Sequence, residues 1–483
     1  MLKGTIYFTI RQFIFVVTNF ILHAYLGRKL GPELYGIFGV VSAIIIISDF
    51  VLSKGVFETL SKFVAQNEKA ANGILKNALK VMTVTYIIVG VILFFLSKQI
   101  AIIMKDPELG PYIKLCAFII SIGGISTVYS GVLNGLRQFG KQAVISVFSS
   151  VIKLISVLLM VYLGYSVKGA ILGIIISEAF GLSLAAILCR IPRSNVDFDG
   201  KEMVHFSLQM IVIGLFASLV MNIDLLALKI IIRDNLEIGL YTSATTIAKI
   251  GFLLMYPVSL TVIPTISKSL SDGNMAHTEH TIIHALKLIL MFVLPISFAI
   301  MASSKNCIFL LYGEQYVPAS AALNILMLGT IFFSIKAVLY NIIVASGWPR
   351  YIIFLGVLSL AIDILLLLYL IDKFGIVGAA AASAITHLFG LVVSYIYVAH
   401  KYLKRIIPVH FVKIIVASII VYLIAMLYSP NGIMLIIYYG LLLVIFFGIL
   451  IIMREIKLQN LKMALAKAWK TYRTDRMAGG FPL

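Results

Sequence analysis

The chain has 483 residues, of which 61% are hydrophobic and only 12% are charged. An ordinary soluble domain carries about 25% charged residues, and the mean hydropathy here is +1.06, so the composition excludes a soluble globular protein. The net charge of +19 does not indicate nucleic-acid binding, because the basic residues lie in short connections and a tail. The partners that this charge favours are membrane lipids with anionic headgroups.

Apolar runs long enough to cross about 30 Å of hydrocarbon predict membrane spans along the whole chain. The first run contains polar residues and no small-residue cleavage site follows it, which favours a retained span over a signal peptide. A polar stretch at residues 190–203 separates six spans from a further eight. The predicted spans are residues 5–26, 35–53, 78–97, 112–136, 143–163 and 168–189, then 204–232, 240–266, 281–303, 317–343, 351–370, 375–399, 406–428 and 432–453.

These spans predict an all-α polytopic membrane protein with about 14 transmembrane helices. We expect two six-helix lobes followed by a C-terminal helix pair. The tail carries leucines, Trp469 and Tyr472 on one helical face among lysines, which indicates a helix on the inner leaflet; a solvated tail is the alternative. The expected domains are a first lobe (1–190), a cytoplasmic linker (191–203), a second lobe (204–400), accessory helices 13 and 14 (401–453) and a basic tail (454–483).

The distribution of Lys and Arg predicts the orientation. If the N-terminus is cytoplasmic, the inside segments hold 23 of the 39 basic residues and the outside loops hold eight. Cytoplasmic loops of membrane proteins carry such an excess of positive charge. We therefore expect a multi-pass protein of the plasma membrane with both termini in the cytoplasm.

The two halves of the sequence resemble each other. Matching residues recur at spacings of 206 and 209, although chance matching of common residues is an alternative explanation. Six spans followed by their repeat give a parallel repeat, and transporters built in this way place the substrate path between the halves. The matches are Val56, Thr59, Ser61 and Lys62 with Val262, Thr265, Ser267 and Lys268, Tyr35 with Tyr241, and Gly169-Ala170 with Gly378-Ala379.

Several charged residues fall inside predicted spans. A charge at the centre of a bilayer costs about 2.5 to 3.5 kcal/mol even on the lenient insertion scale, so these side chains should face a cavity or a partner. Some can instead reach the interface, as we expect for Lys229 and Lys413 near span ends, or pair with each other. Glu178 and His387 occupy equivalent repeat positions, which suits either a coupling-ion site or a hydrogen-bonded core pair. The substrate-binding candidates are Arg11, Lys153, Lys249, Lys287 and Lys336, and the candidates for binding a coupling ion, H⁺ or Na⁺, are Asp49, Glu178, Asp224, Asp363 and His387.

The sequence indicates neither a metal site nor a bound cofactor. The three cysteines, Cys116, Cys189 and Cys307, lie far apart in or beside apolar runs and lack metal-ligand spacing, so they are expected to be packing residues. The outside loops are short and carry no acid and base residues arranged for catalysis. We therefore expect no catalytic residues and a protein that is not an enzyme.

The stretch Leu26–Gly36, LGRKLGPELYG, resembles the first interspan turn of the Wzx-type polysaccharide flippases of the multidrug/oligosaccharidyl-lipid/polysaccharide (MOP) exporter superfamily. Gly31-Pro32 would end one helix, and Glu33 would lie in the first turn of the next. The resemblance implies two MATE-like lobes around a cationic cavity. It also implies ion-coupled export of a lipid-linked oligosaccharide, with polysaccharide-assembly proteins as possible partners. The resemblance continues at Gly239-Leu240-Tyr241, Tyr312–Tyr316, Ala345–Pro349 and Gly375–Ala380.

Other functions compete with this interpretation. A multidrug or cation antiporter would favour an acidic or aromatic cavity, whereas this chain has five deep cations against four deep carboxylates. A lipid II flippase would favour arginines, and most deep cations here are lysines. A membrane polysaccharide polymerase would need a sizeable catalytic loop, and no connection is that long. A scaffold in an envelope-synthesis complex is a further alternative.

Overall fold

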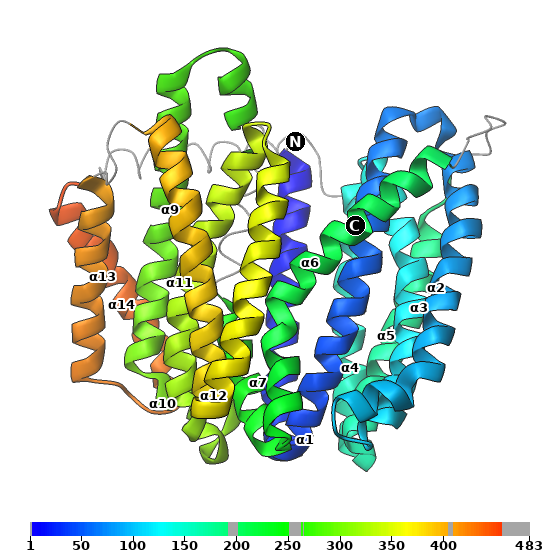
Figure 1. Ribbon diagram of the computed structural model, residues 1–483, viewed down its shortest axis with the longest axis horizontal. Helices are drawn as coiled ribbons and strands as arrows, with labels where there is room; N and C mark the ends of the chain where they lie inside the picture. The colour runs from blue at the N-terminus through cyan, green and yellow to red at the C-terminus, as the bar shows by residue number, and fades with distance from the viewer. Residues whose placement is uncertain (1, 192–200, 251–261, 264, 404–408, 456–483) are drawn as a thin grey trace, which may run out of the picture.

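The computed structural model describes residues 2–191, 201–250, 262–263, 265–403 and 409–455. Within these ranges, nine helices are long and apolar enough to cross a membrane, which confirms the all-α polytopic fold (Figure 1). Three of them, Tyr7–Asp49, Phe139–Leu188 and Arg350–Tyr402, each contain two predicted spans. The total number of spans stays a prediction, because most of the linker, much of the span at 240–266 and the amphipathic tail lie outside the described residues.

The first bundle is formed by helices α1 to α5. Helix α1 breaks at Gly31, whose φ of 75° is accessible to glycine without strain, and the chain turns back at the Gly31-Pro32 pair, as predicted. A π-helical turn joins α4 to α5. The elements are α1 (Leu2–Gln66), η1 (Glu68–Ala70), α2 (Ala71–Ile103), α3 (Leu109–Gly135), α4 (Phe139–Met160), η2 (Val161–Tyr165) and α5 (Ser166–Leu188).

The second bundle follows, with α6 running diagonally between the two (Figure 1). The start of α6 packs on the first bundle, where Phe206 meets Phe63 with ring centroids 6.2 Å apart. The pair α13 and α14 packs against α9 on the outer side of this bundle. The elements are α6 (Lys201–Ile232), α7 (Asn235–Ala248), α9 (Met275–Ala302), α10 (Ser304–Tyr312), η3 (Glu314–Ala319), α11 (Ser320–Ala345), α12 (Pro349–Tyr402), α13 (Val409–Leu427) and α14 (Met434–Ile452).

The hydrophobic core is shared at one end of the molecule and divided at the other. One cluster joins both bundles and includes Tyr35, Ile113, Tyr241 and Tyr316. Toward the end that carries the N-terminus there are two separate clusters, one confined to the second bundle and α13–α14, and one built from the first bundle and the start of α6. In the described part of the chain, the core that both bundles share therefore lies at the end opposite the N-terminus, which we call the closed end, while the start of α6 also packs on the first bundle.

Helices from the two bundles cross in direct backbone contact at the closed end. A Cβ atom on Gly36 would lie 2.0 Å from the carbonyl oxygen of Asn235, and one on Gly239 would lie 1.8 Å from the carbonyl oxygen of Pro32. No side chain fits at such distances, so this crossing requires glycine in both helices. The close approach brings the buried Tyr35 of α1 against Tyr312 of α10, with ring centroids 5.6 Å apart.

Polar contacts between the bundles reinforce the closed end. Lys229 donates to Asp106 Oδ2 at 2.6 Å, and its side chain is only 1% exposed. Asn235 donates to the same oxygen at 3.2 Å. Burial opposes ionisation of Asp106, but the hydrogen bonds from Lys229 and Asn235 hold the pKa of its carboxyl below the ordinary value. The expectation that Lys229 reaches the membrane interface is therefore wrong, because a carboxylate of the other bundle satisfies its charge inside the protein.

A second tie involves Arg28, which lies just before the turn in α1. Its guanidinium donates to the carbonyl oxygens of Leu310 and Leu311, at 2.5 and 2.9 Å. These carbonyls belong to the last turn of α10, where a positive charge is favourable. Arg28 therefore caps a helix of the opposite bundle.

We predict that Asp106→Asn loosens the closed end. Removing one partner of a buried ion pair costs about 3 to 5 kcal/mol when the other charge stays buried, so Lys229 should be released toward solvent. The measurement is labelling of a single cysteine placed at Ala101, which is 1% exposed, in a variant without its native cysteines. Labelling should rise in Asp106→Asn and fall again when Lys229→Met is added. The exposed neighbour Lys105→Gln is the control, and equal labelling in all variants would contradict the prediction.

Candidate functional site

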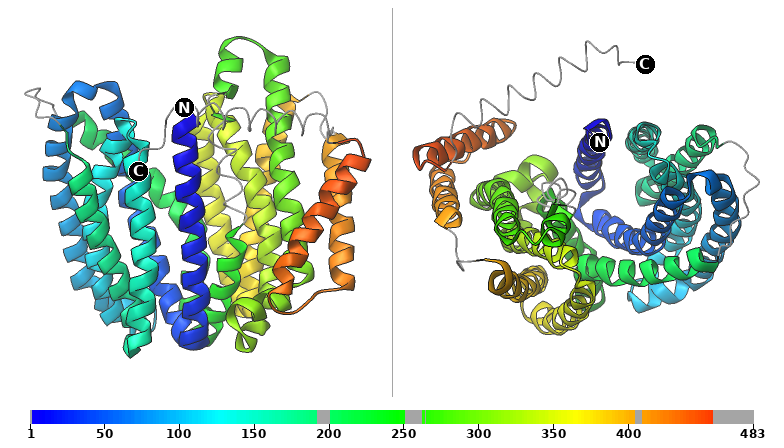
Figure 2. Two further views of the ribbon diagram at one scale, coloured as in Figure 1. Left: turned by 180° about the vertical axis from the view of Figure 1, so that it is seen from behind. Right: turned by 90° about the horizontal axis from the view of Figure 1, so that it is seen from above.

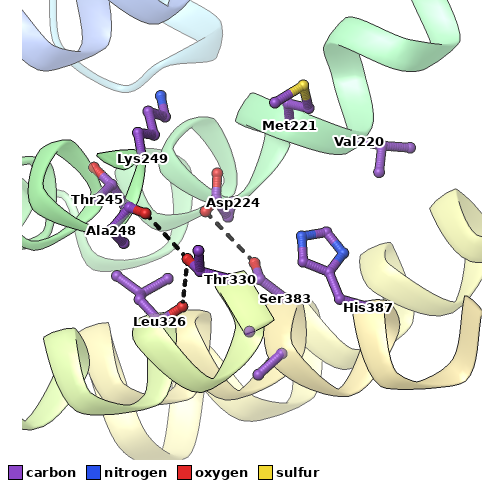
Figure 3. Close-up of a pocket in the computed structure, with 12 residues that line it drawn as sticks. Val220, Met221, Asp224, Thr245, Ala248, Lys249, Leu326, Thr330, Ser383 and His387 are labelled. Carbon is purple, nitrogen blue, oxygen red and sulfur yellow. Dashed lines mark hydrogen bonds between the residues drawn. The ribbon is translucent and has the colours of Figure 1, made fainter. Parts of the chain in front are cut away.

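A pocket whose lining includes charged and hydroxyl side chains lies in the second bundle between α6, α7, α11 and α12 (Figure 3). It encloses about 500 Å³, part of which is open to solvent. Thr330 of α11 ties the walls together, since its hydroxyl contacts the carbonyl oxygens of Ala248 at 3.1 Å and Leu326 at 2.9 Å. The exposed side chain of Lys249 points away from the wall formed by α11 and α12 (Figure 3).

Asp224 supplies the carboxylate of this pocket. Tyr241 of α7 donates to its Oδ2 at 2.6 Å, and Ser383 of α12 donates to the same oxygen at 3.5 Å. Three helices therefore converge on one partly buried carboxylate. Oxygen ligands of this kind suit a proton or a hard cation, although within the described residues no group of three or more His, Cys, Asp or Glu is arranged to hold a metal ion.

A second set of titratable residues lies on α11 and α12, with His387 reaching the pocket wall. Asp363, 1% exposed, accepts a hydrogen bond from Thr386 at 3.0 Å. Lys336, 4% exposed, lies with its Nζ 3.2 Å from His387 Nδ1, and an ammonium can only donate, so the imidazole accepts there. These four side chains form two hydrogen-bonded pairs beside the pocket, Asp363 with Thr386 and Lys336 with His387.

The predicted residues of the first bundle also gather. Lys153 of α4 donates to Asn19 Oδ1 of α1 at 3.4 Å. Glu178 of α5 acts electrostatically on Lys153 and on Asp49. Asp49 in turn accepts a hydrogen bond from Ser53 at 2.6 Å. Glu178 therefore lies within electrostatic range of one lysine and one carboxylate of this bundle.

His23 connects the basic residues of the two bundles. Lys153 of the first bundle and Lys249 at the end of α7 both act electrostatically on its imidazole. His23 Nδ1 lies 2.9 Å from the hydroxyl of Tyr35, and Tyr35 belongs to the core of the closed end. We call the region between the bundles around Lys153, Lys249 and His23 the seam. It lies directly beside the region where the bundles join.

Lys287, a predicted substrate residue, lies apart from this seam. Lys287 of α9 contacts Glu455 Oε1 at 2.5 Å, and Glu455 also contacts His410 at 2.7 Å. That cluster fastens α13 and α14 to the second bundle. Arg11 lies near the start of α1 with its guanidinium 5.0 Å from the centroid of the Phe8 ring, and it does not line the pocket.

Sequence reasoning missed the uncharged partners of the site. Asn19, His23, Tyr241, Ser383 and Thr386 were not among the predicted site residues, although each contacts or acts on one of them. Polarity within an apolar span was the available signal for Asn19 and His23. Tyr241 was marked by its match with Tyr35 and by the stretch Gly239-Leu240-Tyr241, but nothing in the sequence separates Ser383 and Thr386 from the other hydroxyl side chains of α12.

The fold and the site together define a multi-pass α-helical membrane protein with two bundles and a charged seam between them. Its sequence places it more narrowly. The chain belongs to the polysaccharide biosynthesis protein family, whose model matches residues 25–321. This match confirms the family resemblance, and it includes the stretches Leu26–Gly36, Gly239-Leu240-Tyr241 and Tyr312–Tyr316.

The similar proteins include transporters of known fold. The probable low-salt glycan biosynthesis flippase Agl15 of Haloferax volcanii is 22% identical over 370 residues, covering 75% of this chain and 76% of that protein. The putative O-antigen transporter of Shigella flexneri is 21% identical, covering 75% and 88%. The structure resembles the lipid II flippase MurJ in an inward closed conformation, with a TM-score of 0.74, 16% identity and coverage of 94% and 99%. An inward-facing multidrug resistance MATE transporter has a TM-score of 0.67, with 16% identity and coverage of 81% and 94%.

The separation of Lys287 from the seam gives a prediction. Lys287→Gln should lower thermal stability by weakening the attachment of α13 and α14, because Glu455 is 1% exposed and loses a charged partner. It should leave the affinity for an anionic lipid unchanged. Lys153→Gln should weaken the binding of that lipid and leave thermal stability unchanged. Melting temperature and binding of a polyprenyl diphosphate, measured on both purified variants, test this. A loss of binding in Lys287→Gln at unchanged stability would refute the separation.

Proposed function

We propose that this protein translocates a polyprenyl-diphosphate-linked oligosaccharide across the plasma membrane, for synthesis of a cell-surface polysaccharide. The observation that carries the proposal is the position of two lysines from different bundles: Lys153 lies against Asn19 and Phe15 of α1, and the exposed Lys249 lines the pocket of the second bundle. A diphosphate is the anionic part of such a lipid, and lysine ammonium groups bind phosphate oxygens by charge-assisted hydrogen bonds. The names of the relatives from Haloferax volcanii and Shigella flexneri support the same class of substrate.

The transport mechanism that fits the fold is alternating access. The bundles share a core only at the closed end, and the distribution of basic residues predicts that the N-terminus and the open end face the cytoplasm. In this state a lipid-linked sugar would enter from the cytoplasmic leaflet. Rocking of one bundle against the other would then separate the closed end and open the seam to the outside.

The coupling ion would bind in the second bundle. Asp224 receives hydrogen bonds from Tyr241 and Ser383, and the Asp363–Thr386 pair lies on the neighbouring helices. We propose that this region holds H⁺ or Na⁺. In this scheme Glu178 and Asp49 of the first bundle, two further carboxylates within predicted spans, are a second site for the ion.

The first test is transport by seam variants. Lys153→Gln and Lys249→Gln should each weaken binding of the diphosphate by about 1.5 to 3 kcal/mol, the contribution of a hydrogen bond to a charged group, which is roughly tenfold or more in affinity. Flipping of a fluorescent polyprenyl-diphosphate sugar in proteoliposomes is the measurement. Lys373→Gln, an exposed lysine on α12, is the matched control.

Wild-type flipping at the rate of protein-free vesicles, with several sugars and both ion gradients, would refute the proposed function. Unchanged flipping in both seam variants would refute the role of the basic seam alone. Accumulation of a cationic drug against a gradient would favour a multidrug antiporter instead, and transport of lipid II but not of other lipid-linked sugars would narrow the function to that substrate.

The second test concerns coupling. Asp224→Asn keeps hydrogen-bonding capacity but removes the charge that would hold a cation or accept a proton. We expect substrate binding within about twofold of wild type and no acceleration of flipping by an imposed Na⁺ or H⁺ gradient. Gradient-driven flipping at the wild-type rate in Asp224→Asn would exclude this carboxylate as the coupling site.

A further inference from the structure

The first half of α1 exposes two opposite faces of different chemistry. At 100° per residue, Ile10, Phe13 and Val17 lie together on one face, which is apolar. Phe15 lies on the opposite face. Phe15 is 43% exposed, and Phe13, two residues earlier on the apolar face, is 68% exposed. Between Phe8 and His23, the residues within about 80° of Phe15 are Phe8, Arg11, Gln12, Thr18, Asn19, Leu22 and His23, and of these Thr18 and Leu22 are buried.

A membrane helix that packs only against apolar neighbours does not require a stripe of polar residues along one face. Amide and imidazole groups are costly against lipid, so the polar face must meet protein or a hydrated space, while the apolar face suits lipid. Seen from above, this part of α1 stands between the two bundles (Figure 2). The polar face thus belongs to the seam.

Contacts with Lys153 fix the direction of the polar face. The ammonium lies 5.2 Å from the centroid of the Phe15 ring and 3.4 Å from Asn19 Oδ1. The next group along the stripe, His23, lies within the electrostatic reach of the same lysine. An aromatic ring and an amide therefore flank the cation that we assign to the diphosphate.

The residue types on this face exceed what a phosphate alone requires. An aromatic ring presents a flat apolar surface, which matches the C–H face of a sugar ring, and an amide can both donate to and accept from hydroxyl groups. The sugar is joined covalently to the diphosphate, so it must lie beside whatever holds the phosphate. From Arg11 to His23 the stripe is about 18 Å long at 1.5 Å per residue, enough for more than one sugar ring.

We propose that Phe15 and Asn19 form the subsite for the sugar nearest the diphosphate, and that the stripe on α1 selects the glycan. This inference rests on the proposed function and deepens it. Lys153 would hold the charge common to all polyprenyl diphosphates, and Phe15 and Asn19 would distinguish one attached sugar from another or from none. Specificity would then reside on a single helix of the first bundle.

The experiment compares two ligands on each variant. Binding is measured for an undecaprenyl diphosphate carrying a sugar and for the same lipid without one, using Phe15→Leu and Asn19→Ala. Phe15→Leu keeps apolar bulk and removes the ring. Phe13→Leu is the matched control, since it makes the same change on the opposite face of the same helix. Phe15→Trp tests rescue by another aromatic ring.

The glycosylated lipid should bind roughly fivefold more weakly to Phe15→Leu, as expected for loss of a stacking contact, and the sugar-free lipid should bind as to wild type. Phe13→Leu should change neither, and Phe15→Trp should retain binding of the sugar. Equal losses for both lipids, or no loss for either, would overturn the sugar subsite while leaving the proposed function in place. Wild-type protein that binds neither lipid would overturn the proposed function, and the subsite with it.

Discussion

The contact between Gly36 and Gly239 is the constraint on which the architecture depends. Two helices from different bundles touch backbone to backbone there, and around this point one apolar core serves both bundles. The other two clusters of the described residues do not join the bundles in this way, since one lies in the second bundle and one combines the first bundle with the start of α6. The buried Lys229–Asp106 pair and the cap that Arg28 places on α10 then add directional contacts to a junction that apolar packing alone would leave free to slide.

The position of the site follows from this geometry and from the cost of polar groups in lipid. Charged side chains in spans must be directed inward or paired. Where the bundles share a core, Lys229 is paired with Asp106. Where they separate, Lys153 and Lys249 can lie in the seam with solvent for part of their surroundings. The cost of a charge in lipid therefore accounts both for the Lys229–Asp106 pair at the closed end and for the basic side chains next to it.

Hydropathy was sufficient to predict the fold class, and the Gly31-Pro32 turn was predicted from its residue types. Partners were harder to predict, because they depend on helix rotation and on contacts between distant segments. Lys229 was expected to reach the interface because it lies near a span end, and its partner Asp106 lies 123 residues earlier, in a loop. Lys287 looked like a cavity residue, yet its partner Glu455 follows α14. Tyr241 and Ser383 became identifiable only once α7 and α12 were seen to converge on Asp224.

The two bundles also differ in chemistry. Glu178 acts on Lys153 in the first bundle, and His387 contacts Lys336 in the second, at the repeat positions predicted to be equivalent. Yet the first lysine lies beside an exposed aromatic ring and an amide, whereas the second is buried. Because His23 hydrogen-bonds to Tyr35, and Tyr35 packs against Tyr312 across the junction, a ligand that displaces His23 must disturb contacts that hold the closed end together. Occupancy of the seam and closure of the junction would in this way be energetically linked, as alternating access requires.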